Sequence, residues 1–296
     1  MAGKLKQAQE TPKAAKAAIY LVLILLALLI IVPVFWVFMA SIKENVEFYR
    51  DPWALPSGIY LQNFADAWQK ASMGSYMFNS VIVTALGIFL LVVIALPAAY
   101  VLSRFQFRSK RFWNVLFMAG LFINVNYIVV PIFLMLSNGD TFLRRLIGQP
   151  FFLNNLFMLA LVYAATALPF TVYLLSGYFR TLPKDYEEAA YVDGAGYFRT
   201  MTTVILPMAK PSIVTVILFN FLAFWNEYII SMTLLTKPAL KTLPVGLMNL
   251  MAAQRSAVQY GQMYAGLVIV MLPTLLLYIC VQKKLTQGMT LGGLKG

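Results

Sequence analysis

Six long apolar blocks decide what this chain can fold into. Each is close to the roughly 20 residues that a helix needs to cross a bilayer. Only 11% of the 296 residues are charged, whereas about a quarter are charged in a soluble domain. We therefore predict an all-α polytopic membrane protein with six transmembrane helices, at residues 17–40, 76–103, 112–136, 153–178, 211–235 and 260–281.

The lysines and arginines predict the orientation of these spans. Fifteen of the 23 fall on the side that holds both termini, and the positive-inside rule makes that side cytoplasmic. The net charge of +12 thus reflects topology rather than nucleic-acid binding. The first apolar block is too long for a cleavable signal peptide. The predicted parts are a cytoplasmic arm (1–16), a transmembrane domain (17–285) with periplasmic loops at 41–75 and 236–259 and a cytoplasmic loop at 181–210, and a cytoplasmic tail (286–296).

Composition also limits the chemistry. The chain has no histidine, which removes the usual general base and the commonest metal ligand. Its single cysteine, Cys280, excludes an intrachain disulfide. A phosphate loop of the GxxxxGK[ST] type is missing, so the chain does not bind ATP by that route. We expect no catalytic residue, no metal site and no cofactor bound by this chain.

The residues from Thr181 to Pro211 form a polar interval with helix signals at both ends. Thr181 is expected to cap a helix whose first turn holds Asp185, Glu187 and Glu188, where the helix dipole favours carboxylates. Gly194 and Gly196 are expected to end it. A second short helical run, 197–204, is predicted to stop at Leu206-Pro207. By physics alone, a docking element and an ordinary linker are both open.

A resemblance favours docking. Glu188-Ala189-Ala190, then Gly194 after three residues and 204–207 (VILP) after nine more, is similar to the EAA loop of binding-protein-dependent ABC importer permeases. Val204 stands where that pattern often has isoleucine. In that family the loop docks in a groove of the cytoplasmic ATPase. The resemblance implies the type I permease fold and ATPase coupling by Glu188, Ala189, Ala190, Asp193, Gly194, Leu206 and Pro207.

The predicted fifth span carries the only acidic residue well inside an apolar block, Glu227. On a continuous helix, Asn220, Glu227 and Ser231 share one face. These three residues and Asn226 are the candidates for a translocation path or gate. A carboxylate in lipid is costly, so Glu227 should face a partner helix or a water-filled path. A gate in the translocation path and a purely structural interhelical hydrogen bond are both open.

The same span extends the resemblance. Residues 224–228 (FWNEY), followed by 242–247 (TLPVGL), resemble the end of span five and its outer loop in carbohydrate ABC permeases, those for maltose and maltodextrins in particular. In that family the outer loop faces the docked binding protein. We therefore expect contact with that protein at Asn249, Ala252, Ala253, Gln254, Arg255 and Ser256. The glycine-rich tail should be flexible and reach the ATPase through Leu291, Gly292 and Gly293.

Two functions of different classes remain. The resemblance implies a permease subunit of an ATP-driven maltose/maltodextrin importer in the bacterial inner membrane, working by alternating access. Its partners would be a second, MalF-like permease subunit, a MalK-like ATPase dimer that uses ATP and Mg²⁺, and a periplasmic maltose-binding protein. The alternative is a proton- or ion-coupled secondary carrier that uses Glu227. An intramembrane enzyme is disfavoured, since nucleophile–base pairs are scarce.

Overall fold

The structure, a computed structural model, describes residues 13–253 and 259–293, and in that part of the chain the secondary structure is helical. The described residues form two compact units. One comprises residues 13–70, 253 and 259–269, the other residues 71–252 and 270–293. The long C-terminal helix α14 (Tyr260–Gly293) begins in the first unit and ends in the second.

The first unit begins with α1 (Lys13–Ser41), whose apolar side chains are exposed around its whole circumference. Two short helices follow, α2 (Asn45–Arg50) and α3 (Gln62–Gln69). The buried Asn63 amide donates to the carbonyl oxygens of Ser41 and Lys43, at 2.9 and 2.8 Å. The predicted loop 41–75 is therefore a folded segment, tied back to the end of α1.

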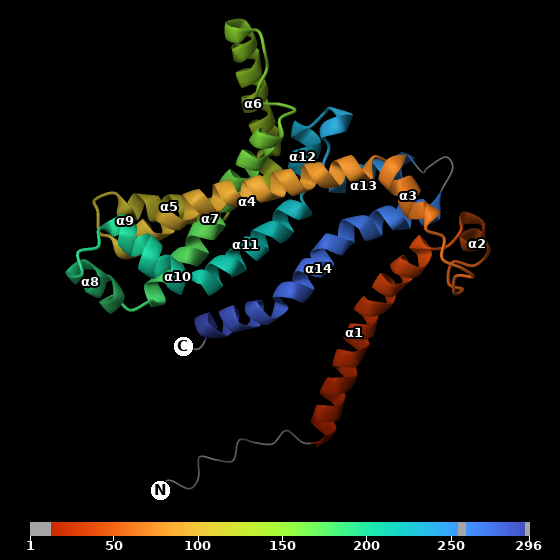
Figure 1. Ribbon diagram of the computed structural model, residues 1–296, viewed down its shortest axis with the longest axis horizontal. Helices are drawn as coiled ribbons and strands as arrows, with labels where there is room; N and C mark the ends of the chain where they lie inside the picture. The colour runs from red at the N-terminus through yellow and green to blue at the C-terminus, as the bar shows by residue number, and fades with distance from the viewer. Residues whose placement is uncertain (1–12, 254–258, 294–296) are drawn as a thin grey trace. The chain divides into compact units, whose positions relative to one another are not determined.

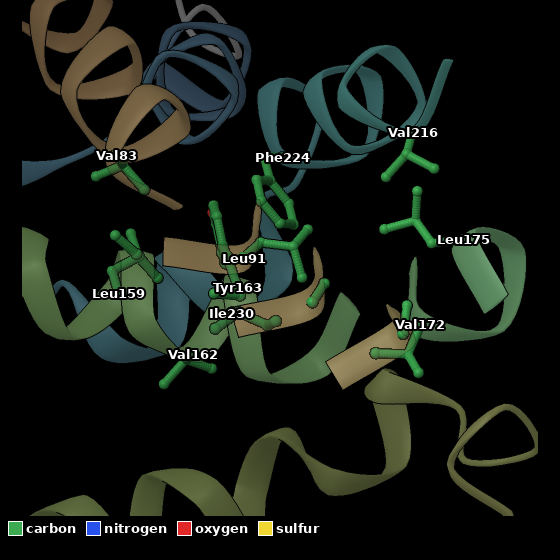
Figure 2. Close-up of a cluster of buried hydrophobic side chains, with 14 of the residues drawn as sticks. Val83, Leu91, Leu159, Val162, Tyr163, Val172, Leu175, Val216, Phe224 and Ile230 are labelled. Carbon is green, nitrogen blue, oxygen red and sulfur yellow. The ribbon is translucent and has the colours of Figure 1, made fainter. Parts of the chain in front are cut away.

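The second unit is built on the pair α4 (Met73–Arg104) and α7 (Leu156–Thr181), against which α11 (Lys210–Trp225) packs. Figure 2 shows the core between them, where Val83 and Leu91 of α4 meet Leu159 and Tyr163 of α7, with Phe224 of α11 above. Alanines at 95, 99, 160 and 164 are fully or almost fully buried. Small residues let membrane helices approach closely, which explains why α4 and α7 form the densest pair.

Four described helices are long and apolar enough to cross a membrane: α1, α4, α7 and α14. The number rises to six if each of two bent helix pairs counts as one span. The expected continuous third span, 112–136, is wrong, because α5 (Lys110–Gly120) and α6 (Val125–Ile147) meet at 105°. Asn124 explains the new start, since its side chain accepts the Asn126 N–H at 3.0 Å and caps α6.

Gly120, the last residue of α5, packs closely against α7. A Cβ atom there would lie 2.7 Å from the ring of Pro169 on α7, so only glycine allows this approach. Beyond the bend, α6 projects from the rest of the second unit (Figure 1). Asp140 of α6 fixes the chain that follows this helix. The buried Asp140 carboxylate accepts the N–H groups of Phe151, Phe152 and Leu153 at 2.6–2.9 Å.

The remaining elements of the second unit lie at two ends. The short helices α8 (Asp185–Val192), α9 (Tyr197–Thr200) and α10 (Leu206–Met208) gather at one end of α4 and α7. At the other end lie α12 (Ile229–Leu234), the turn η2 (Pro238–Leu240) and α13 (Leu243–Ala253) (Figure 1). The two stretches singled out in the sequence are therefore at opposite ends of one helical bundle.

Candidate coupling loop and intramembrane carboxylate

The helix predicted in the EAA-like loop (residues 181–210) exists, but Thr181 does not cap it. The Thr181 hydroxyl donates to the Tyr178 carbonyl at 2.7 Å, so this residue completes α7. In the described structure α8 begins after Lys184 without a side-chain cap. Its first turn carries Asp185, Glu187 and Glu188, as predicted, and these carboxylates compensate the exposed N–H groups electrostatically.

Gly194 ends α8 in the way that the sequence predicts. It adopts the left-handed conformation, with φ of 77°. The Ala195 N–H donates to the Ala190 carbonyl at 2.9 Å and the Gly194 N–H to the Tyr191 carbonyl at 3.0 Å, which is the pattern of a Schellman motif. Gly196 has φ of −74° and begins α9 instead of ending α8.

The second helical run is longer than predicted. After α9 the chain forms one π-helical turn, η1 (Met201–Ile205), and continues through α10 to Met208. Pro207 lies in the first turn of α10, where a missing N–H is tolerated, so it does not stop the helix. The run ends at Ala209 with a bend of 77° into α11.

The residues expected to couple to an ATPase divide between the surface and the core. Glu188, Ala189, Asp193, Gly194 and Pro207 are exposed, Leu206 is half-buried, and Ala190 is buried. The side chains of Glu188 and Ala189 thus form an outer face on α8. Glu187, which the sequence analysis placed only in the first helical turn, is buried instead, with 7% of its surface accessible.

Glu187 pairs with Arg104, a contact that sequence reasoning missed. The Arg104 Nε lies 3.2 Å from Glu187 Oε1, and the two side chains are 5% and 10% exposed. The Arg104 Nη2 also donates to the Leu182 carbonyl at 2.8 Å. In the sequence, Arg104 is one of several basic residues after a span, and nothing in the spacing links it to this loop.

The predicted fifth span is broken, which overturns the helical face proposed for it. The helix α11 ends at Trp225, and α12 begins at Ile229. The Glu227 carboxylate accepts the N–H groups of Ile230 at 2.7 Å and Ser231 at 3.1 Å, so it caps α12. The Tyr163 hydroxyl of α7 donates to the same carboxylate at 2.7 Å. Glu227 therefore has three donors in the bundle.

The other polar residues of this span have separate partners. The Asn220 amide donates to the Thr171 hydroxyl at 3.1 Å and the Val216 carbonyl at 2.8 Å. The exposed Asn226 donates to the Leu222 carbonyl within its own helix. The Ser231 and Thr242 hydroxyls lie 2.9 Å apart. The structure thus brings Glu227 and Ser231 together and leaves Asn220 in the α7–α11 contact.

The predicted binding-protein contacts lie partly on a helix. Asn249 and Ala252 are exposed on α13, and Ala253 ends it. Gln254, Arg255 and Ser256 lie outside the described residues. In the tail, α14 continues to Gly293 and includes the backbone of Leu291, Gly292 and Gly293, where the glycine content predicted a flexible segment. Within the described residues, no group of three potential metal-binding side chains occurs.

These features define a class. Apolar helices interrupted by breaks and prolines, with a structured polar loop at one end, are typical of polytopic membrane permeases. The family follows from direct comparison. Residues 91–291 match the model of the binding-protein-dependent transport system inner membrane component, and the chain belongs to this family.

Curated relatives and a solved structure agree with that assignment. The chain is 36% identical to the diacetylchitobiose uptake system permease protein NgcG of Streptomyces coelicolor, over 98% of this chain and 92% of the relative. It is 30% identical to the trehalose/maltose transport system permease protein MalG of Thermococcus litoralis, over 92% and 94%. A bacterial ABC transporter that imports alginate contains a chain of the same fold, with a TM-score of 0.79 at 22% identity, covering 92% of this chain and 99% of that one.

Proposed function

We propose that this chain is a translocating permease subunit of an ATP-driven importer for maltose and maltodextrins. The observation that carries the proposal is the EAA-like loop. Its helix α8 ends at a left-handed glycine and is anchored by a buried face, while Glu188 and Ala189 remain exposed. A short helix with one anchored face and one free face is suited to dock in a partner's groove.

The partners and topology belong to the same proposal. The family description names a binding-protein-dependent inner membrane component, which supports a second permease subunit, an ATPase dimer and a periplasmic binding protein as partners. Both termini and the EAA-like loop lie on the cytoplasmic side of the bacterial inner membrane, as the lysines and arginines indicate. ATP and Mg²⁺ are used by the partner ATPase.

Three groups of residues have separate roles in this proposal. Asn249, Ala252 and the 253–256 segment contact the binding protein, Leu291 to Gly293 contact the ATPase, and the break around Glu227 and Ser231 borders the translocation path. Movement of α8 with the ATPase then alternates the access of the path to the two sides of the membrane.

Capture of the ATPase tests the coupling role. The tagged chain, purified from its native membrane in mild detergent, should bring down an ATPase with a phosphate loop and a second permease. Glu188→Lys reverses a charge on the outer face of α8 and should remove the ATPase while the second permease stays bound. Glu44→Lys, the same reversal at an exposed position before α2, is the matched control and should keep both. Retention of the ATPase by Glu188→Lys would contradict docking through this face.

Sugar uptake tests the substrate. Relatives whose names mention maltose, trehalose, melibiose and diacetylchitobiose define a panel of labelled sugars. Among these sugars, maltose should be imported with the highest kcat/KM. If another sugar of the panel has the highest kcat/KM, that sugar replaces maltose as the proposed substrate. In proteoliposomes, uptake should require internal ATP and should survive a protonophore. Uptake without ATP that collapses with the proton gradient would instead support a carrier that uses Glu227.

A further inference from the structure

We infer that Arg104 and Glu187 form the joint through which movement of α8 is passed to α4. This inference rests on the proposed function, in which α8 docks on the ATPase. Arg104 and Glu187 act as positioning residues, because the pair connects the docking helix to a membrane span.

The geometry places one guanidinium at the meeting point of three segments. Arg104 is the last residue of α4. Its Nε is 3.2 Å from the carboxylate of Glu187 in the first turn of α8, and its Nη2 donates to the carbonyl of Leu182, which leads from α7 into α8. The arginine therefore holds both the beginning of α8 and the chain that enters it.

Two neighbouring carboxylates give α8 an inner and an outer side. Glu187 is buried against α4, whereas Glu188 is exposed. Successive residues of a helix point about 100° apart, so the two side chains cannot face the same surface. Glu188 and Glu187 are adjacent in the first turn of α8, and Glu187 contacts Arg104. A force applied to α8 at Glu188 is therefore passed to Arg104 within one helical turn.

The contact between Arg104 and Glu187 is electrostatic in character. Among the described residues, neither Arg104 Nε nor Glu187 Oε1 has a hydrogen-bond partner of good geometry, although the two atoms are in ion-pair contact. The attraction is therefore that of two charges rather than of an aligned hydrogen bond.

A line of aromatic rings runs parallel to the ion pair. Edge-to-face contacts with centroid distances of 5.3–6.1 Å connect Phe179 of α7, Tyr100 of α4, Phe105, Tyr197 of α9 and Tyr191 of α8, in this order. Pro97 interrupts the hydrogen bonds of α4 seven residues before Arg104, so the end of α4 can tilt with the loop. The ion pair supplies the polar contact of this joint and the rings its packing.

The test measures coupling apart from assembly. The complete importer is reconstituted with Arg104→Ala, Glu187→Gln, or the exchange Arg104→Glu with Glu187→Arg. ATPase capture is quantified first, and then the ratio of sugar imported to ATP hydrolysed, using the labelled sugar of the panel that the wild type imports. Arg108→Ala, an exposed arginine just beyond α4, is the matched control.

We expect both single variants to capture the ATPase at the wild-type level while the transport ratio falls at least about fivefold, the lower end of coupling between sites. The exchange should recover at least half of the loss, and Arg108→Ala should match the wild type. If Arg104→Ala lowers the yield of folded chain, Arg104→Lys is used in its place, because it keeps the positive charge. Arg104→Lys should keep most of the wild-type transport ratio, whereas Glu187→Gln should lose it.

Three results would overturn the joint: an unchanged ratio in the single variants, loss of ATPase capture in them, or an exchange no better than either single variant. Loss of capture would make the pair a support for the docking face only. Failure of the wild-type chain to capture any ATPase is a different result, because it removes the proposed function itself.

Discussion

The EAA-like loop and the break in the fifth span both place carboxylates at the beginning of a short helix, with opposite consequences. In α8 the outer carboxylate, Glu188, is exposed. In the fifth span the Glu227 carboxylate is occupied by Tyr163 and by two N–H groups of α12. Glu188 is therefore available to a partner protein, whereas Glu227 is already used as a hydrogen-bond acceptor within the chain.

The largest effect is expected from Glu227→Leu. The substitution leaves two backbone N–H groups and the Tyr163 hydroxyl without their acceptor, and each orphaned donor costs about 1–3 kcal/mol. Stability should fall by about 3 kcal/mol or more, which is a drop of roughly 6 °C or more in Tm. Thermal unfolding of the purified chain in mild detergent measures it. Asn226→Leu, at the exposed neighbour, is the control, and equal Tm values for the two variants would refute the cap.

Asn154→Gly tests the other end of α12. Asn154 has φ of 56° and its side-chain oxygen accepts the Thr236 N–H, the Thr236 hydroxyl and the Lys237 N–H at 2.8–3.0 Å. Glycine keeps the left-handed backbone but removes the acceptor, so a loss of about 2 kcal/mol is expected. Asn154→Asp retains the acceptor and should lose less. If both variants unfold at the wild-type temperature, these bonds do not stabilise the segment that follows α12.

Gly194→Ala should weaken docking without destabilising the spans. A Cβ atom at this residue meets nothing within 4 Å, but a left-handed conformation costs an alanine about 1–2 kcal/mol. ATPase affinity should fall about fivefold or more, because α8 no longer stops at its native place. Gly196→Ala adds the same methyl group at φ of −74° and should bind normally. Titration of the ATPase onto immobilised complex distinguishes the two, and equal affinities would show that the stop is unimportant.

Tyr163→Phe should give the smallest change, about 1 kcal/mol, because it removes one of the three donors to Glu227. The same substitution in the Glu227→Leu background should cost less, since the hydroxyl has already lost its partner. The Tm values of the wild type, the two single variants and the double variant give the coupling energy between Tyr163 and Glu227. Additive losses would mean that the 2.7 Å contact contributes nothing.

The EAA-like loop could be predicted from the sequence because its determinants are local. Acidic residues at the first turn and glycine at a left-handed stop act within one helical turn, and both lie where expected in α8. Local rules still erred where a residue had another partner available. Thr181 bonded back into α7, and Pro207 fitted the beginning of α10.

The fifth span could not be predicted in this way. Its residues, 211–235, form one long block of mainly apolar residues, and its few polar residues give no sign of a break between Trp225 and Ile229. The break is stable because the Glu227 carboxylate accepts three hydrogen bonds. Two come from N–H groups of α12, and the third comes from the Tyr163 hydroxyl of α7. Only the packing of α7 beside α12 brings that hydroxyl into place.

By itself the sequence determined that the chain is helical and carries apolar blocks long enough to cross a membrane, and it located the short helix of the EAA-like loop. Hydropathy and local helix signals depend on neighbouring residues, so they can be predicted from the sequence. The tertiary structure alone decided that Glu187 turns inward to Arg104, that Asn220 faces Thr171 and that the third and fifth spans are interrupted. These features depend on buried polar groups finding partners on distant segments, and the bundle determines which partners are within reach.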